Sequence, residues 1–161
     1  MTPQLVPYRT LDHSQVDTLR QLEVTPEQRL ACGDIASTLY TLGSSPPDAV
    51  AGWALLVDRQ PRAFLLLMRA PCLPSWAEPT SAMVLGLQVD HRYQGQGLGR
   101  HCLRALPRQA RGLWPEIDQL TLSVDPGNTT ALKLYRALGW AEAGRGHRAK
   151  VGYERRYRLN L

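Results

Sequence analysis

The feature that most constrains the fold is an apolar run that passes through a glycine-rich turn straight into an amphipathic segment. Residues 82–89, AMVLGLQV, are typical of a buried central strand. Three glycines follow within residues 95–99, and an apolar stripe that begins at Leu98 predicts a helix. Residues 119–124 alternate apolar and polar side chains and predict a second strand. The sequence therefore predicts a parallel β-α-β crossover between residues 82 and 124.

Shorter signals predict the elements on either side of this crossover. They are a strand at Leu5–Tyr8, a helix capped by Asp12, a helix from Thr25 to about Leu42, a hairpin of residues 51–57 and 63–69, a helix at 129–138 ended by Gly139, and two antiparallel strands joined by a basic turn within 140–161. Pro107 is expected to kink or end the central helix. We therefore expect an α/β (α+β) fold with a mixed, mostly antiparallel twisted sheet, a central parallel crossover and flanking helices.

The length and composition fit one ordinary globular domain that spans residues 1–161. Hydrophobic residues make up 43% and charged residues 20% of the 161 residues. No apolar run reaches the about 18 residues of a membrane span, and the N-terminus does not read as a signal peptide. The three cysteines and four histidines show no metal-ligand or disulfide spacing. We expect a cytoplasmic protein with no membrane partner and no bound metal.

The turn before the central helix has the chemistry of a phosphate site. An apolar strand that leads into glycines and a helix start collects unpaired backbone N–H groups at the positive end of the helix dipole. Glycines let an anion approach the backbone closely, because no Cβ intervenes. Taken alone, a tight strand–helix turn without a ligand explains Gly95, Gly97 and Gly99 equally well. The spacing matches neither a Rossmann nor a Walker pattern.

A second motif follows about thirty residues later, in the segment from Asn128 to Trp140. Helical periodicity places Tyr135 on one face with three apolar side chains, so on pattern alone it is a core aromatic residue. Asn128 stands where a helix cap is expected. From these residues alone, the structural and the functional interpretation both remain open.

The two motifs together resemble the signatures of the GCN5-related N-acetyltransferase (GNAT) superfamily. The first is Gln94-x-x-Gly97-x-Gly99, and the second is N-x-x-A-x-x-L-Y-x-x-x-G-W at residues 128–140. The resemblance implies a GNAT-type fold and acetyl-CoA as cosubstrate. It implies that Leu87, Gln88 and Val89 pair with the pantetheine arm. It also implies that the pyrophosphate is held by the backbone of Gln94, Gly95, Gln96, Gly97, Leu98, Gly99 and Arg100.

The same resemblance gives roles to two side chains and suggests a subgroup. It implies that Asn128 contacts the cofactor arm and that Tyr135 lies near the thioester sulfur. Within the superfamily, residues 24–28, 90–95 and 122–128 are similar to bacterial polyamine (spermine/spermidine) acetyltransferases. The chain departs from that subgroup at residues 83–87, where aromatic residues are usual, and at Tyr153–Tyr157, which replaces a short acidic ending.

The implied reaction is direct transfer of the acetyl group to an amine. The N–H of Leu87 or Val89 is expected to stabilise the oxyanion, and Tyr135 to protonate the leaving thiolate, whose basicity is similar to that of a phenol. The base remains open: the alternatives are Asp90, Glu78, Glu23 or water relayed by Ser81, Ser123 or a backbone carbonyl. An acetyl-cysteine intermediate on Cys102 is disfavoured, because its position on the helix faces the core.

The formal net charge of +5 is concentrated near the end of the chain, at Arg145, Arg148, Lys150, Arg155, Arg156 and Arg158. A solvated strand face explains this cluster best, a clamp for a phosphate or an acidic substrate comes next, and nucleic acid is an unlikely partner.

The sequence is compatible with three functions. The first is acetylation of a primary amine of a small molecule. The second is acetylation of protein N-termini or lysines, and the third is a non-catalytic acetyl-CoA-binding module. Exposed edge strands in the tail make a homodimer possible.

Overall fold

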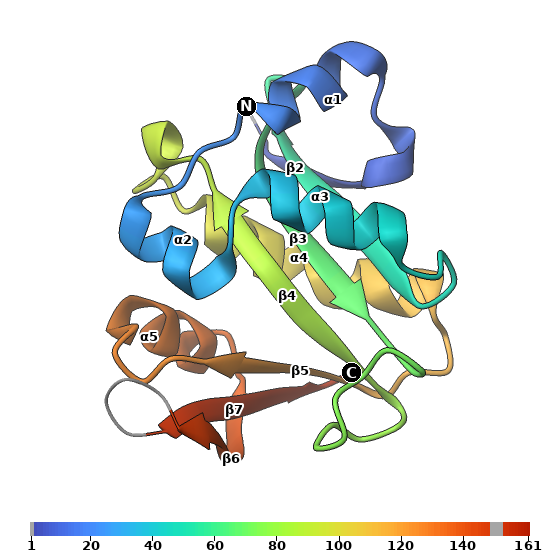
Figure 1. Ribbon diagram of the computed structural model, residues 1–161, viewed down its shortest axis with the longest axis vertical. Coiled ribbons are helices and arrows are strands. Elements are labelled where there is room, and N and C mark those ends of the chain that lie inside the picture. Colours follow the sequence, from blue (N-terminus) through green and yellow to red (C-terminus); the bar gives the residue numbers. More distant parts are fainter. Residues whose placement is uncertain (1, 149–152) are drawn as a thin grey trace.

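The computed structural model describes residues 2–148 and 153–161, without the side chains of residues 145–148. The described strands form one seven-stranded sheet in the order β1-β2-β3-β4-β5-β7-β6 (Figure 1). Every neighbouring pair is antiparallel except β4 and β5, which are parallel. The strands are β1 Gln4–Pro7, β2 Val50–Val57, β3 Gln60–Met68, β4 Ser81–Val89, β5 Gln119–Val124, β6 Ala141–Arg148 and β7 Tyr153–Asn160. The predicted fold class and its central crossover are confirmed.

The helices cover both faces of this sheet. They are α1 His13–Arg20, α2 Pro26–Cys32, α3 Ile35–Ser44, α4 Leu98–Leu113 and α5 Thr129–Ala137, with short 3-10 turns η1 Tyr8–Thr10 and η2 His91–Tyr93. In Figure 1, α2 and α3 lie on the near face and α4 on the far face. The core on the α4 face includes Leu103, Leu120 and Tyr157, and α5 packs against it; the core on the other face includes Leu19 and Phe64.

The helix predicted from Thr25 to about Leu42 is broken in two, which corrects the sequence prediction. Gly33 ends α2 with a φ of 76°, a conformation that glycine adopts without strain. Asp34 then caps α3 by accepting a hydrogen bond from the Ser37 amide at 2.8 Å. The break turns the chain so that Cys32 and Thr38 lie against Gly86 of β4. It therefore shapes one side of the site described below.

Of the two outcomes expected at Pro107, the end of the central helix is wrong, because α4 runs for 16 residues from Leu98 to Leu113. The expected kink stays a prediction. An internal proline costs about 3 kcal/mol. Three fully buried leucines on this helix offset that cost, since each contributes roughly 1.5–3 kcal/mol. They are Leu98, Leu103 and Leu106. Within the described ranges, no helix is long and apolar enough to cross a membrane.

Candidate active site

The central feature of the site is the point where β4 and β5 separate. Their parallel pairing ends at Met83–Thr121, although β4 continues to Val89 and β5 to Val124. On its other side β4 stays paired with β3, but the register shifts between Phe64 and Leu66. Gly86 lies opposite this irregularity with a φ of 58°. The bulge turns β4 away from β5 and leaves one edge of β4 open.

A backbone donor of β4 faces this open edge. The Asp90 amide donates to the Arg62 carbonyl of β3 at 2.9 Å. Because successive residues of a regularly paired strand point their N–H groups to opposite sides, that of Val89 faces away from β3. The side chain of Gln88 is buried and donates to Thr38 Oγ1 at 2.7 Å. By the same alternation its N–H faces β3, so Gln88 offers the open edge neither its side chain nor its N–H.

The turn at residues 94–100 is a run of uncommitted donors. None of its seven amides donates to another described residue, and the first bond into α4 runs from His101 N to Gly97 O. Gly97 caps the helix in the left-handed conformation and supplies no side-chain acceptor. A Cβ built on Gly95 or Gly97 would meet nothing within 4 Å. Such a nest at a helix N-terminus suits a phosphate group.

Two side chains hold this turn in place. Gln94 donates through Nε2 to the Val89 carbonyl at 2.9 Å and to Gln28 Oε1 of α2 at 2.9 Å. Arg92 binds the buried Asp90 carboxylate through Nε and Nη2 at 2.9 and 2.6 Å. Burial alone would raise the Asp90 pKa, but the hydrogen bonds and charge of Arg92 lower it. Asp90 therefore braces the turn and is poorly suited to take a proton.

Three other candidates for the base or the proton relay, Glu78, Ser81 and Glu23, are also poorly placed. Glu78 is exposed in the loop before β4, and Ser81 donates to its carbonyl at 2.7 Å at the closed end of the β4–β5 pair. Glu23 is 67% exposed and lies 3.5 Å from His91 Nε2. This leaves Ser123, on the strand that borders the opening, as the candidate with the best position.

Tyr135 lies on α5 beside the opening. Its ring packs 5.7 Å from that of Trp140 and 6.2 Å from that of Tyr157. Burial, and to a smaller extent the nearby Cys32 thiol of α2, raise the pKa of Tyr135 to about 12. The phenol therefore keeps its proton at neutral pH, and it is a weaker acid than an ordinary tyrosine.

Asn128 stands at the N-terminus of α5. Its Oδ1 accepts from the Ala131 amide at 3.2 Å, so the side chain is a helix cap, as its pattern predicts. Its predicted contact with the cofactor arm stays a prediction, and so do the cofactor roles of residues 87–89 and 94–100. Gly99 lies beside Val89 of β4 and Leu134 of α5, so the turn, the end of β4 and α5 meet at this opening.

Glu154 of β7 is a carboxylate beside the opening that the sequence analysis did not single out. Ser123 Oγ donates to Glu154 Oε2 of β7 at 2.8 Å. Tyr157 is buried on the α5 face, so Glu154 lies on the opposite face by strand alternation. That is the face of α2 and α3. The register β4–β5 places Ser123 level with Leu85 across the opening.

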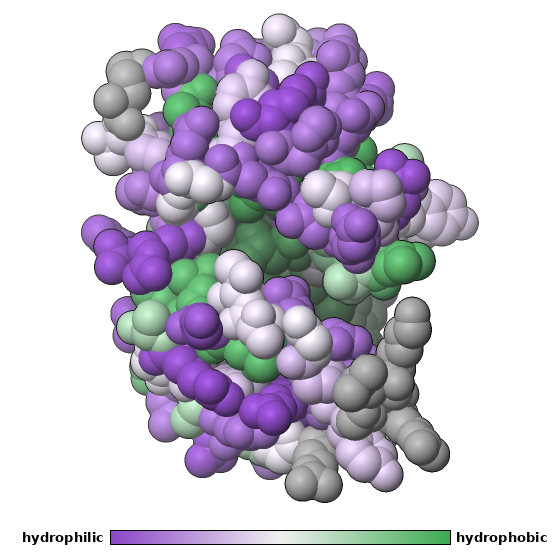
Figure 2. All heavy atoms as spheres, turned by 90° about the vertical axis from the view of Figure 1, so that its left-hand side faces the viewer, coloured by the Kyte–Doolittle hydropathy of each residue, from purple (hydrophilic) through white to green (hydrophobic). Residues whose placement is uncertain are grey.

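A cavity of about 240 Å³ lies on this same face beside the bulge. Leu85 and Gly86 of β4 form one side, and Cys32, Ser37 and Thr38 of α2 and α3 form the other. Its lining is apolar or neutral, without an acidic side chain. Figure 2 views the molecule from the side that carries α2 and α5, and shows an apolar hollow between two polar lobes.

The remaining nucleophiles and ligands of the sequence do not form a second centre. Cys102 is fully buried, and burial raises its pKa to about 12, so it is a poor nucleophile. Within the part of the chain that the structure describes, no three histidine, cysteine or acidic side chains gather as metal ligands would. Lys150 and the side chains of Arg145, His147 and Arg148 lie outside the described residues.

Comparison with known proteins gives a family and a set of similar structures. The model of the acetyltransferase (GNAT) family matches residues 11–140. No match was found among curated proteins. Among solved structures, the GNAT domain of S. lividans PAT matches with a TM-score of 0.74 and 18% identity, over 100% of this chain and 92% of that chain.

Two further structures match over nearly the whole chain. A Bacillus subtilis acetyltransferase in complex with CoA has a TM-score of 0.70 and 13% identity, over 99% of both chains. The ribosomal-protein-S18-alanine N-acetyltransferase of Escherichia coli has a TM-score of 0.65 and 21% identity, over 99% of this chain and 93% of that chain. At these identities the structures show a shared fold.

Proposed function

Because the chain belongs to the GNAT family of acetyltransferases, we propose that it moves an acetyl group from acetyl-CoA to a primary amine of a small molecule by direct transfer. The observation that carries this proposal is the run of uncommitted amides at 94–100, set at the end of a strand with an open edge. The amides would hold the pyrophosphate, and the edge at residues 87–89 would pair with the pantetheine arm. This fits the CoA found in the Bacillus subtilis structure.

Acetyl-CoA supplies the acetyl group as an activated thioester. The N–H groups of Leu87 and Val89 would stabilise the negative charge that develops on its carbonyl oxygen. Tyr135, which its raised pKa keeps protonated at neutral pH, would give its proton to the sulfur as negative charge develops there and the C–S bond breaks. The attacking amine would lose its proton to Ser123 Oγ, which passes its own proton to Glu154 at 2.8 Å.

The acceptor is proposed to be a small amine with little other positive charge. The cavity beside Gly86 is small and has no acidic lining, so it offers nothing to neutralise a polycation. Arg156 adds positive charge to the same face, where it stacks on Trp76 at 4.2 Å. The finer resemblance to polyamine acetyltransferases thus stays a prediction, and the cavity favours a different acceptor.

The direct test measures thiol release from acetyl-CoA across monoamines, amino acids, polyamines and N-terminal peptides. We expect turnover with monoamines or amino acids and at least tenfold lower kcat/KM with polyamines, because an unneutralised ammonium group would be buried. Turnover confined to peptides would replace the proposed acceptor class. CoA binding without turnover of any amine would favour a binding module, and absence of CoA binding would overturn the proposal.

The role of Glu154 gives a separate prediction. Glu154→Gln should lower kcat/KM about 100-fold at pH 7, because Ser123 loses the group that takes its proton. The loss should shrink as pH rises toward the pKa of the amine, since the acceptor then arrives neutral. Glu142→Gln is the matched control, because Glu142 lies on the neighbouring edge strand, where it forms an ion pair of 3.9 Å with Arg155. An equal loss at every pH would show a structural role.

A further inference from the structure

A second and larger cavity lies near the opposite edge of the sheet. β1 pairs with β2 only as far as Pro7–Trp53, although β2 begins at Val50. Proline has no N–H to continue the ladder, and the chain turns into η1 directly afterwards. The edge of β2 from Val50 to Gly52 is therefore left uncovered by β1. A cavity of about 680 Å³ opens at this place.

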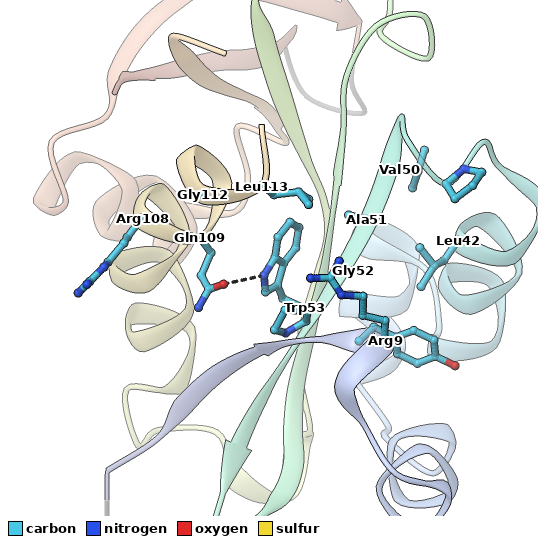
Figure 3. Close-up of a pocket in the computed structure, with 13 residues that line it drawn as sticks. Arg9, Leu42, Val50, Ala51, Gly52, Trp53, Arg108, Gln109, Gly112 and Leu113 are labelled. Atoms are coloured by element: carbon cyan, nitrogen blue, oxygen red, sulfur yellow. Dashed lines mark hydrogen bonds between the residues drawn. The ribbon is translucent and has the colours of Figure 1, made fainter. Parts of the chain in front are cut away.

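The walls of this cavity, which we call the β2-edge pocket, are largely apolar (Figure 3). Val50, Ala51 and Trp53 form the floor, with Leu42 of α3 on one side and Leu113 of α4 on the other. Gly52 has no room for a side chain, because a Cβ there would approach the Phe64 ring to 2.7 Å and Leu42 Cδ2 to 3.1 Å. A volume of this size is within the range of pockets that hold small organic molecules.

The polar groups around the β2-edge pocket are few and of two kinds. Gln109 of α4 is committed to the fold: its Oε1 accepts from Trp53 Nε1 at 3.2 Å, and its Nε2 donates to the Leu5 carbonyl at 3.1 Å. The side chain of Arg9 has no hydrogen bond or ion pair to any other described residue. Figure 3 shows Arg9 reaching over Gly52 toward Trp53, whereas Arg108 points away from the pocket.

We propose that the β2-edge pocket binds a small organic carboxylate with an apolar body. The apolar floor would bury the body, and Arg9 would pair with the carboxylate at the mouth. Charge selects the ligand class, because Arg9 lies at the mouth and no acidic residue lines the pocket. The pocket is separate from the acetyl-transfer site, because β2 and β4 are on either side of β3 in the sheet. The proposal therefore does not depend on the proposed reaction.

The test follows the indole N–H signal of Trp53 by NMR, assigned with Trp53→Phe, while ligands are added. The probes are 4-phenylbutanoate, 4-phenylbutanol and 4-phenylbutylamine, which share one apolar body and differ in charge. We expect saturable shifts of the Trp53 signal and about tenfold tighter binding of the carboxylate than of the alcohol. The amine should bind more weakly than the alcohol, and added CoA should not compete.

Variants of two exposed arginines separate charge from apolar contact. Arg9→Gln should reduce carboxylate binding to the level of the alcohol, and its exposed position leaves the fold intact. Arg104→Gln on α4 is the control, because this exposed arginine does not line the pocket. Equal binding of the three probes, an unchanged affinity in Arg9→Gln, or no shift up to about 10 mM ligand would each overturn the proposal. A shift produced only by an extended acidic peptide would overturn it as well.

Discussion

Tyr135→Phe is expected to lower kcat by about 10²- to 10³-fold and to leave the Kd for CoA within about twofold. The substitution removes one hydroxyl and keeps the ring that packs on Trp140 and Tyr157. Without it, the leaving thiolate must take its proton from water. Because the binding contacts proposed for CoA are backbone groups elsewhere, binding and catalysis should separate. Pre-steady-state thiol release and calorimetric CoA titration measure the two quantities.

Tyr157→Phe is the matched control for this prediction. The Tyr157 hydroxyl is buried and has no hydrogen-bond partner among the described residues. Removing such a hydroxyl leaves no group unsatisfied, so stability and kcat should stay close to those of the parent protein. If both variants lost activity equally, the aromatic cluster rather than the Tyr135 proton would be responsible. Full activity of Tyr135→Phe would remove Tyr135 from the mechanism.

The sequence predicts those parts of the fold that depend on neighbouring residues. The crossover between residues 82 and 124 follows from strand and helix periodicity, and the structure has it. The break at Gly33 was missed because apolar periodicity on both sides of it reads as one helix. The predicted helix end at Pro107 is wrong because burial against the sheet outweighs the local cost of the proline, and no local pattern reports that burial.

The candidate site divides in the same way. The turn at 94–100 and Tyr135 are found from motifs, because each lies within one short segment. Glu154 lies 31 residues from Ser123 and reaches it only because β7 inserts between β5 and β6. A sequence prediction that paired the last strand with residues 119–124 would have brought these two side chains together. The β2-edge pocket depends on three distant segments, and no motif marks it.

A pair of substitutions at Gly97 tests whether the turn at residues 94–100 binds the phosphate groups of CoA. Its φ is 75°, a conformation that asparagine and aspartate also adopt, and the space around it is open. Gly97→Asn should bind CoA slightly more weakly than the parent protein. Gly97→Asp should bind it about 100-fold more weakly than Gly97→Asn. A carboxylate about 6 Å from a phosphate costs about 3 kcal/mol at an effective dielectric constant of about 20.

The two Gly97 variants should have nearly the same Tm without CoA, and this separates repulsion from damage to the fold. A carboxylate at the start of α4 interacts favourably with the helix dipole, so Gly97→Asp should be at least as stable as Gly97→Asn. The affinity gap should narrow as salt rises, because ions screen the repulsion. Equal CoA affinity of the two variants would mean that the anion lies elsewhere. A large loss in Gly97→Asn with a lowered Tm would assign the effect to backbone strain, since both variants share the same shape.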